Sequence, residues 1–313
     1  MPGWRWSGGG GALLPAEPAG HALISGGSSG IGLALAHRLG VAGWDLTILA
    51  RDPVRLAQAQ AALAVHGRAV VIHSADVADA AAVAEAVDAS VRRLGPPGLV
   101  VACAGMVIPG EIEAQPADAF RRSIEVNYLG ALHLVHAALP AMRARGGRIV
   151  LLASGAALVG LYGYSSYAPS KFAVRGLAEA LRSELSAGRI GVSVVYPPDT
   201  DTPGFRAERR ARPEIVNRLA GAGGLLTADQ VAQAILRGVA RGRFAITPGL
   251  PMTVLAWLHS LAVPVLNRFW FDPLIARAAR AGDRAGLTRG GHPEQLRQIA
   301  RGWGQGRRSC RLR

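Results

Sequence analysis

The chain has 313 residues, of which 50% are hydrophobic and 18% are charged, and its 35 Lys and Arg against 21 Asp and Glu give a formal net charge of +14. This balance excludes an intrinsically disordered chain, whose apolar content would be too low to bury a core. The length fits one α/β domain of about 250 residues with extensions, or two smaller domains. Two cysteines, Cys103 and Cys310, are too few for a disulfide framework, which favours a reducing, cytoplasmic environment.

The two ends of the chain differ in composition from its middle. Residues 1–20 contain four consecutive glycines and three prolines but no apolar stretch long enough for a signal peptide, so they are predicted to form a flexible leader. Residues 277–313 contain ten arginines against Asp283 and Glu294, a net charge of +8. This arginine-rich tail favours an anionic lipid surface. No specific nucleic-acid partner is expected, because Trp303 is the tail's only aromatic residue and a stacking surface needs several.

Between these ends, short apolar runs alternate with alanine-rich stretches of helical periodicity. In chain order the pattern predicts a strand at 21–25, a helix at 31–41, a strand at 45–49, a helix at 53–65, a strand at 69–73, a helix at 78–94, a strand at 98–103, a helix at 116–139, a strand at 148–153, a helix at 165–185, a strand at 191–196, a helix at 228–240 and a strand at 244–247. Strands this apolar are typical of a parallel sheet covered by helices on both faces. Residues 21–248 are therefore predicted to form one doubly wound, Rossmann-type α/β domain.

A glycine-rich turn separates the first predicted strand from the first predicted helix. Its sequence, over residues 25–32, is Ser-Gly-Gly-Ser-Ser-Gly-Ile-Gly, and the expected cofactor contacts in it are Gly26, Ser28, Ser29, Gly30, Ile31 and Gly32. Glycines in such a turn let the backbone approach a pyrophosphate, which binds at the N-terminus of the following helix. A strand before the turn and a helix after it favour a dinucleotide-binding site.

The residues that follow the second and third strands bear on the choice of dinucleotide. NAD sites place a carboxylate at the end of the second strand, whereas this chain has an alanine there, followed by Arg51. A guanidinium at this place favours the 2′-phosphate of NADP(H), with Arg55 or Ser28 as a second contact. After the third strand, Asp76 and Val77 are expected beside the adenine, although an aspartate there is equally suited to capping a helix.

Tyr167 and Lys171 lie four residues apart in the helix predicted at 165–185, and therefore on one face of it. An ammonium group beside a phenol lowers the pKa of the phenol toward the working range of an acid–base catalyst. Lys171 is the only lysine in the chain, and arginine would be a poor substitute because its pKa cannot be tuned in this way. Ser154, at the end of the fifth predicted strand, is placed to hydrogen-bond a carbonyl oxygen. No metal site is expected.

These motifs together resemble the short-chain dehydrogenase/reductase family over about residues 20–248. The resemblance rests on the glycine turn, on Ser154, Tyr167 and Lys171, and on Asn127 in a Val-Asn-Tyr run. It implies that Tyr167 protonates a ketone oxygen as NAD(P)H delivers hydride, and that Ser154 orients the carbonyl group. It further implies that Lys171 binds the nicotinamide ribose and that Asn127 holds a water for proton relay. An active oxidoreductase, assembled as a homodimer or homotetramer, is therefore expected.

The remaining cofactor contacts also come from this resemblance. They are Ala104, Gly105, Tyr167, Lys171, Pro198, Thr200 and Thr202. Two departures from the family pattern fall among them. Residues 102–105 read Ala-Cys-Ala-Gly where the family has Asn-Asn-Ala-Gly, which removes amides that brace the central sheet. Pro197-Pro198 stands in place of Pro-Gly, which stiffens the approach to the nicotinamide amide.

The second departure narrows the resemblance. Residues 196–205, with 103–106, 127–130 and 170–180, look like the corresponding runs in 3-ketodihydrosphingosine reductases, which use NADPH to reduce the C3 ketone of a long-chain amino ketone at a membrane surface. This implies a long-chain lipid ketone as substrate and a place in sphingolipid synthesis. The alternatives are another apolar carbonyl or alcohol, such as a steroid, and an inactive cofactor-binding scaffold, which the complete catalytic set disfavours.

Residues 249–276 extend the domain with an apolar segment. The twelve residues from Met252 to Val263 lie between two prolines, and a helix of that length is about 18 Å long against about 30 Å of membrane hydrocarbon, so it is not expected to span a bilayer. An apolar helix followed by aromatic residues at 269–271 and by the basic tail favours attachment in the plane of a membrane, at its cytosolic face. The alternative is that this helix packs on the domain or across a dimer interface.

Overall fold

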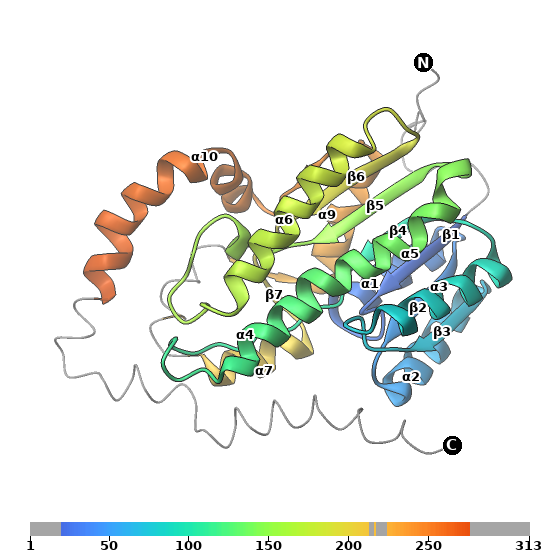
Figure 1. Cartoon of the computed structure of the whole chain (residues 1–313), viewed down its shortest axis with the longest axis horizontal. Helices are drawn as coiled ribbons and strands as arrows, with labels where there is room; N and C mark the ends of the chain where they lie inside the picture. The colour runs from blue at the N-terminus through green and yellow to red at the C-terminus, as the bar shows by residue number, and fades with distance from the viewer. Residues whose placement is uncertain (1–19, 213–215, 217–223, 276–313) are drawn as a thin grey trace.

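A computed structural model of the chain describes residues 20–212, 216 and 224–275 (Figure 1). Apart from Gly20, the predicted leader lies outside the described residues, and so does the whole arginine-rich tail.

The centre of the structure is a parallel sheet that has seven strands within the described residues. The strands are β1 (His21–Ser25), β2 (Asp45–Ala50), β3 (Val70–Ser74), β4 (Pro97–Ala102), β5 (Gly147–Leu152), β6 (Ile190–Val195) and β9 (Ala245–Ile246). They lie in the order β3-β2-β1-β4-β5-β6-β9, and every neighbouring pair is parallel. The chain winds outward from β1 to one edge, returns to β4 beside β1 and winds to the other edge. This confirms the predicted doubly wound fold and places its switch point between β1 and β4.

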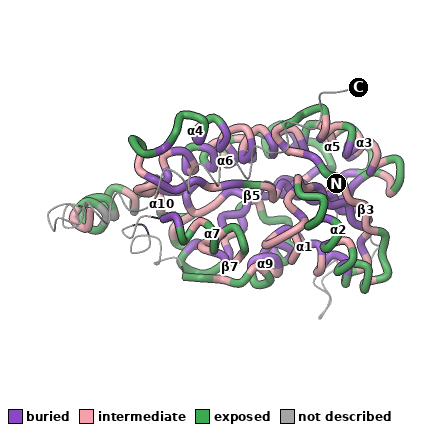
Figure 2. Tube along the Cα trace, turned by 90° about the horizontal axis from the view of Figure 1, so that it is seen from below, coloured by how far each residue is buried: buried purple, intermediate pink, exposed green. Residues whose placement is uncertain are grey.

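Helices cover both faces of this sheet (Figure 2). One face carries α1 (Gly30–Val41), α2 (Pro53–Leu63) and α9 (Ala228–Ala240), and the other carries α3 (Ala80–Leu94), α5 (Gly130–Arg145) and α6 (Tyr167–Glu184). Side chains of a strand alternate between the faces, so Leu23 packs in the core on the α5 side while its neighbours Ala22 and Ile24 pack in the core on the α1 side. Burial on both faces explains why the strands are apolar without a period of two.

The helix predicted at 116–139 is longer and less regular than expected. It consists of α4 (Ala117–Ser123), a π-helical stretch (Ile124–Leu129) and α5, so it continues past Pro140 to Arg145. The prediction that it ends before this proline is wrong. The ring of Pro140 is exposed, where water can satisfy the carbonyl that loses its partner, and the buried Met142 two residues later packs the helix on the core.

Three of the described elements between β6 and α9 have no counterpart in the sequence prediction. The short strands β7 (Asp199–Asp201) and β8 (Leu225–Thr227) pair in parallel, and α7 (Pro203–Ala211) follows β7 directly. The Thr202 hydroxyl caps α7 by accepting a 3.1 Å hydrogen bond from the Phe205 amide. Strands of three residues are too short to show a period, which is why the apolar pattern misses them.

The C-terminal apolar segment forms α10 (Leu250–Leu266), followed by a π-helical stretch (Asn267–Phe271), and extends away from the body of the molecule as an arm (Figure 1). The expected limits at the two prolines are wrong, because Pro251 lies in the first turn, where its missing N–H has no helical partner to lose, and Pro264 lies near the end. Among the described residues no single helix is long and apolar enough to cross a membrane. The segments Leu250–Leu261 and Val263–Ile275 reach that length together, with an 87° bend between them.

Candidate active site

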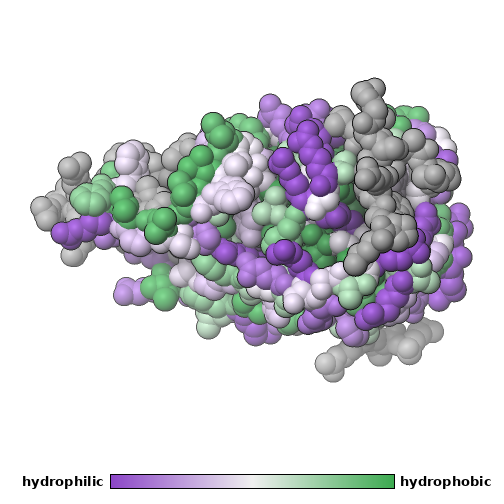
Figure 3. Space-filling view, turned by 90° about the horizontal axis from the view of Figure 1, so that it is seen from above, coloured by the Kyte–Doolittle hydropathy of each residue, from purple (hydrophilic) through white to green (hydrophobic). Residues whose placement is uncertain are grey.

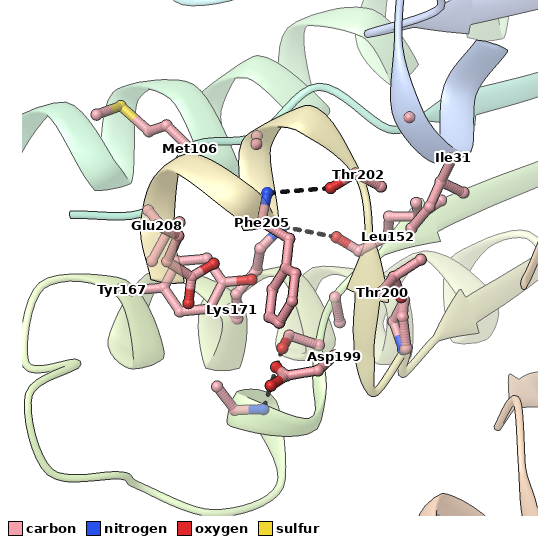
Figure 4. Close-up of a pocket in the computed structure, with 18 of the residues that line it drawn as sticks. Ile31, Met106, Leu152, Tyr167, Lys171, Asp199, Thr200, Thr202, Phe205 and Glu208 are labelled. Atoms are coloured by element: carbon pink, nitrogen blue, oxygen red, sulfur yellow. Dashed lines mark hydrogen bonds between the residues drawn. The ribbon is translucent and has the colours of Figure 1, made fainter. Parts of the chain in front are cut away.

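A cavity of about 1170 Å³ opens at the carboxyl ends of β1, β4, β5 and β6, on the switch point of the sheet (Figure 4). One end is lined by the glycine turn before α1, and the other by α7 and the α10 arm. The predicted site residues that line it are Gly26, Ser28, Ser29, Gly30, Ile31, Arg51, Arg55, Val77, Ala104, Gly105, Ser154, Tyr167, Lys171, Pro198, Thr200 and Thr202. Gly32, Asp76 and Asn127 do not line it.

Two glycines of the turn, Gly26 and Gly32, are packed so closely that neither position has room for a Cβ. Gly26 has φ +70°, and a Cβ placed there would lie 2.8 Å from the Ala104 nitrogen. A Cβ on Gly32 would lie 2.3 Å from the Gly26 carbonyl oxygen, so Gly32 serves the packing of the turn and not the lining of the cavity. The Ser29 side chain makes no capping hydrogen bond to α1. The amide groups at the start of this helix therefore face the cavity without a side-chain acceptor, an arrangement that suits a pyrophosphate.

Two arginines lie where the second strand ends, as expected for a 2′-phosphate. Arg51 and Arg55 both line the cavity. Asp52, between them in sequence, also lines it, but its carboxylate accepts hydrogen bonds from the amides of Val54 (3.0 Å) and Arg55 (3.1 Å) and caps α2. Arg55 Nε also pairs with Asp52 Oδ2 at 3.3 Å, and two arginines against this one carboxylate leave the corner with a positive charge, so the residues present fit NADP(H) better than NAD(H).

Asp76 does not line the cavity, and its carboxylate is held within the protein. It accepts hydrogen bonds from Arg122 Nη2 (2.5 Å) and from the Ala78 amide (3.1 Å), and these contacts, together with the charge of Arg51, hold its pKa below the ordinary value against the opposing effect of burial. Each of its oxygens accepts one of these bonds, and the expected contact with the adenine stays a prediction. Its neighbour Val77 does line the cavity.

Ser154, Tyr167 and Lys171 meet in the middle of the cavity. Ser154 follows β5, and its hydroxyl lies close enough to Tyr167, the first residue of α6, to lower the pKa of the phenol. One turn further along α6, the buried Lys171 donates a 2.9 Å hydrogen bond to the Leu152 carbonyl, and its Nζ lies 5.7 Å from the centre of the Tyr167 ring. The structure therefore brings together the three residues that the sequence singles out.

The electrostatics of this group differ from the expected simple pairing. Burial lowers the pKa of Lys171 to about 8. Burial also raises the pKa of Tyr167 above its ordinary value, and the hydrogen bond from Ser154 opposes that rise. The expectation that Lys171 lowers the pKa of the tyrosine is not met in the protein alone. The physical reason is that the ammonium group is held at the Leu152 carbonyl and lies beside the ring, not at the hydroxyl.

Asn127 lies in the π-helical stretch and is fully buried outside the cavity. Its side-chain amide accepts a 2.8 Å hydrogen bond from the Met106 amide and donates to the Met106 carbonyl (2.9 Å) and the Ser170 hydroxyl (2.8 Å). It thus fixes the loop after β4 against α6. The structure gives Asn127 a positioning role, and its expected role in holding a water stays a prediction.

The loop after β4 is braced although its asparagines are missing. The Ser25 hydroxyl accepts hydrogen bonds of 3.2 Å from the amides of both Cys103 and Ala104, which tie the loop to the end of β1. Cys103 is half-buried and lines the cavity, and burial raises the pKa of its thiol to about 12, so the thiol is protonated at neutral pH.

Beyond Tyr167 the cavity becomes mainly apolar, and the part of this lining that α10 supplies is absent from the sequence prediction. Its apolar lining includes Met106, Val107, Val159, Leu161, Phe205, Met252, Leu255, Leu258 and Trp270. Residues from α10 close one wall, which the sequence does not reveal because α10 is distant from the motifs. A polar cluster formed by Tyr164, Asp199, Glu208 and Arg212 was also missed. The spacing of Glu208 and Arg212, four residues apart near the end of α7, was the only available signal.

A family model described as short chain dehydrogenase matches residues 20–213. The chain belongs to this family. A 3-dehydrosphinganine reductase of Arabidopsis thaliana is 42% identical over 232 residues, which are 72% of this chain and 69% of the relative. A 3-ketodihydrosphingosine reductase of Bos taurus is 36% identical over 80% of this chain and 78% of the relative.

Two solved structures of the same family share the fold. A short-chain dehydrogenase/reductase from Burkholderia phymatum in complex with NAD has a TM-score of 0.69 and 27% identity, covering 78% of this chain and 92% of the other. An alcohol dehydrogenase from Thermococcus sibiricus complexed with 5-hydroxy-NADP has a TM-score of 0.65 and 26% identity, covering 73% and 95%. Membership of this oxidoreductase family confirms the expected enzyme class.

Proposed function

We propose that the protein is an NADPH-dependent reductase that converts 3-ketodihydrosphingosine to dihydrosphingosine. The observation that carries the proposal is the meeting of Ser154, Tyr167 and Lys171 in one cavity, between a phosphate-binding turn and an apolar compartment. The curated relatives named above, which act on this ketone by name and match most of this chain, support the choice of substrate.

The chemistry follows from the positions of these side chains. NADPH supplies a hydride to the ketone carbon when it is bound. Tyr167, whose pKa burial raises, is protonated at neutral pH and is therefore ready to give its proton to the ketone oxygen. Ser154, which lines the cavity close to Tyr167, holds that oxygen beside the phenol. Lys171 would contact the ribose of the cofactor, because it lines the cavity beside Tyr167 with its ammonium group held at the Leu152 carbonyl.

The apolar compartment suits a long alkyl chain. Side chains from the loop after β4, from α7 and from α10 supply hydrocarbon on several sides. Each methylene group that leaves water contributes about 0.8 kcal/mol, so even a partly enclosed lipid chain gains several kcal/mol. This supports a lipid ketone over a small polar one.

The α10 arm supports the delivery of this substrate from a membrane surface. Trp257 is 83% exposed and Leu261 is 77% exposed, whereas Met252 and Leu258 on the same helix line the cavity. Figure 3 shows hydrophobic residues exposed along the part of the surface that this arm forms. An apolar surface next to the cavity mouth is suited to lying in the headgroup region of a bilayer, so that a lipid passes between bilayer and cavity with little contact with water.

We also keep the prediction of a homodimer or homotetramer. Light scattering of the purified protein in detergent and in buffer tests it.

The experiment that tests the proposed function is NADPH oxidation, followed at 340 nm, with 3-ketodihydrosphingosine in mixed micelles. NADH and a steroid ketone are run in parallel. Rapid turnover of the sphingoid ketone with NADPH, and little with NADH, is the expected result. If only the steroid ketone were turned over rapidly, the proposed substrate would be wrong and the proposed reductase chemistry would stand.

A further inference from the structure

Four polar side chains form a cluster in the wall of the apolar compartment: Tyr164, Asp199, Glu208 and Arg212. Arg212 donates two 2.9 Å hydrogen bonds to the two oxygens of Asp199 and one of 2.9 Å to Glu208 Oε1. Only 3% of the Arg212 side chain and 12% of the Glu208 side chain are exposed. Such a cluster is costly to bury in an apolar wall, so it calls for a functional explanation.

The cluster has one negative charge in excess, because two carboxylates share one guanidinium. Arg206, on α7, does not supply the missing positive charge. It forms an ion pair with Asp201 and does not line the cavity. Burial raises the pKa of Glu208, as expected for a carboxylate that is incompletely neutralised. A ligand that brings a positive charge to this wall would balance the cluster.

Glu208 has one carboxylate oxygen, Oε2, that is available to accept a hydrogen bond from a ligand. All of its contacts are made by Oε1, which accepts from the Tyr164 hydroxyl and from Arg212. Within the part of the chain that the structure describes, no hydrogen bond or ion pair reaches Oε2. A carboxylate held firmly by one oxygen, with the other toward a cavity, is a preorganised acceptor for a cation.

The position of this acceptor relative to the chemistry is specific. The charges of Glu208 and Asp199 both contribute to raising the pKa of Tyr167, so they lie within electrostatic reach of the hydroxyl that serves the ketone. Figure 4 draws Glu208 and Tyr167 on the same side of the cavity. In 3-ketodihydrosphingosine, the carbon next to the ketone carries an amino group. A ketone held at Tyr167 therefore brings an ammonium group into the region of Glu208.

We propose that Glu208 binds the ammonium group of the substrate and selects α-amino ketones over plain ketones of the same length. This inference rests on the proposed function. The role is one of substrate binding and selection, since proton transfer to the ketone belongs to Tyr167.

The test compares two substrates and two enzymes. The substrates are 3-ketodihydrosphingosine and 1-hydroxyoctadecan-3-one, which keeps the chain, the hydroxyl and the ketone and lacks only the amine. The variant is Glu208→Gln, whose amide oxygen still accepts from Arg212 and Tyr164 while the charge is gone. We expect the wild-type protein to favour the amino ketone in kcat/KM. The variant should lose about 10- to 100-fold on the amino ketone, mainly through KM, and much less on the plain ketone.

The matched control is Asp201→Asn, which removes a carboxylate from the same segment outside the cavity, and which should leave the preference between the two ketones unchanged. NADPH binding and turnover of the plain ketone report that the Glu208→Gln protein is folded. Equal losses of kcat/KM on both ketones would assign Glu208 a structural role and overturn the inference. A variant that keeps wild-type kcat/KM on both ketones would overturn it as well. Failure of the wild-type protein to reduce either sphingoid-length ketone would instead reject the proposed function, and that result needs no variant.

Discussion

Ser154 and Tyr167 both line the cavity, and the Ser154 hydroxyl lies close enough to the phenol to lower its pKa, although the first residue follows a strand and the second begins a helix. In the proposed reaction a carbonyl oxygen accepts hydrogen bonds from both hydroxyl groups. Tyr167 would give up its proton and Ser154 would keep its own, because a phenol is a stronger acid than an aliphatic alcohol.

Replacing Tyr167 with Phe should remove turnover and keep cofactor binding. The ring that packs beside Lys171 remains, while the proton donor is lost, so kcat should fall by at least about 100-fold. NADPH oxidation and the fluorescence of bound NADPH measure the two effects. Tyr128→Phe, on a tyrosine that does not line the cavity, is the control. Near wild-type turnover by Tyr167→Phe would assign the proton to another group.

Lys171 should give the free energy of unfolding a distinct dependence on pH. Burial lowers its pKa from 10.5 to about 8, so between these values the unfolded chain holds a proton that the folded chain lacks. Stability then rises with pH through this group, by at most about 1.4 kcal/mol per pH unit. Cys103 acts in the opposite direction only above pH 9, because burial raises the pKa of its thiol from 9.0 to about 12.

Urea unfolding from about pH 7.5 to 9 therefore isolates the lysine. The difference in free energy of unfolding between the wild-type protein and Lys171→Met should move in favour of the wild type as the pH increases. Two curves that stay parallel over this range would show that the lysine is protonated throughout.

Gly26 and Gly67 offer a matched pair for the glycine turn. Both have positive φ, at +70° and +65°, but a Cβ on Gly26 meets the Ala104 backbone whereas a Cβ on Gly67 meets nothing within 4 Å. Gly67→Ala should cost only the backbone strain, about 1 kcal/mol. Gly26→Ala should cost more and also weaken NADPH binding, as measured by urea unfolding and by titration with NADPH. Equal effects of the two substitutions would mean that the turn relaxes freely.

Arg51 should set the preference for the phosphorylated cofactor. Arg51→Ala removes a charge from the corner of the cavity at the end of β2, so KM for NADPH should rise about 10- to 100-fold and KM for NADH should change little. Arg68→Ala is the control, because Arg68 pairs with Asp45 outside the cavity. Equal changes with both cofactors would place Arg51 elsewhere than at the 2′-phosphate.

The sequence identifies residues that the structure brings into one cavity, because the pattern that marks them is local. Tyr167 and Lys171 share a helix face through their spacing alone, and the glycine turn is contiguous. Asp76 shows the limit of this reasoning. Its partner Arg122 lies in α4, far away in the sequence, and no residue near Asp76 predicts the contact.

The fold shows the same division. Buried strands are visible as apolar runs, but α10 runs through Pro251 and Pro264 because of where these prolines fall in the helix. The excess negative charge at Glu208 can be recognised only once Asp199 and Arg212 are seen beside it, and β7 and α7 bring these residues together. Contacts between separate elements depend on the folded chain, and a pattern along the sequence cannot supply them.

The exposed side of α10 should account for the affinity for membranes. Glutamate at Trp257 and Leu261, two exposed residues that do not line the cavity, should weaken binding to vesicles of phosphatidylcholine and phosphatidylserine by at least about tenfold, because two apolar contacts with the bilayer are lost and negative charge is added. The control carries glutamate at Val41 and Val65, which are 75% and 79% exposed on the main domain, and should bind vesicles as the wild type does. Cosedimentation measures binding, and NADPH affinity reports that the cavity is intact. Equal binding by all three proteins would show that α10 does not enter the bilayer, and the arm would then be better explained as a surface that covers another copy of the chain.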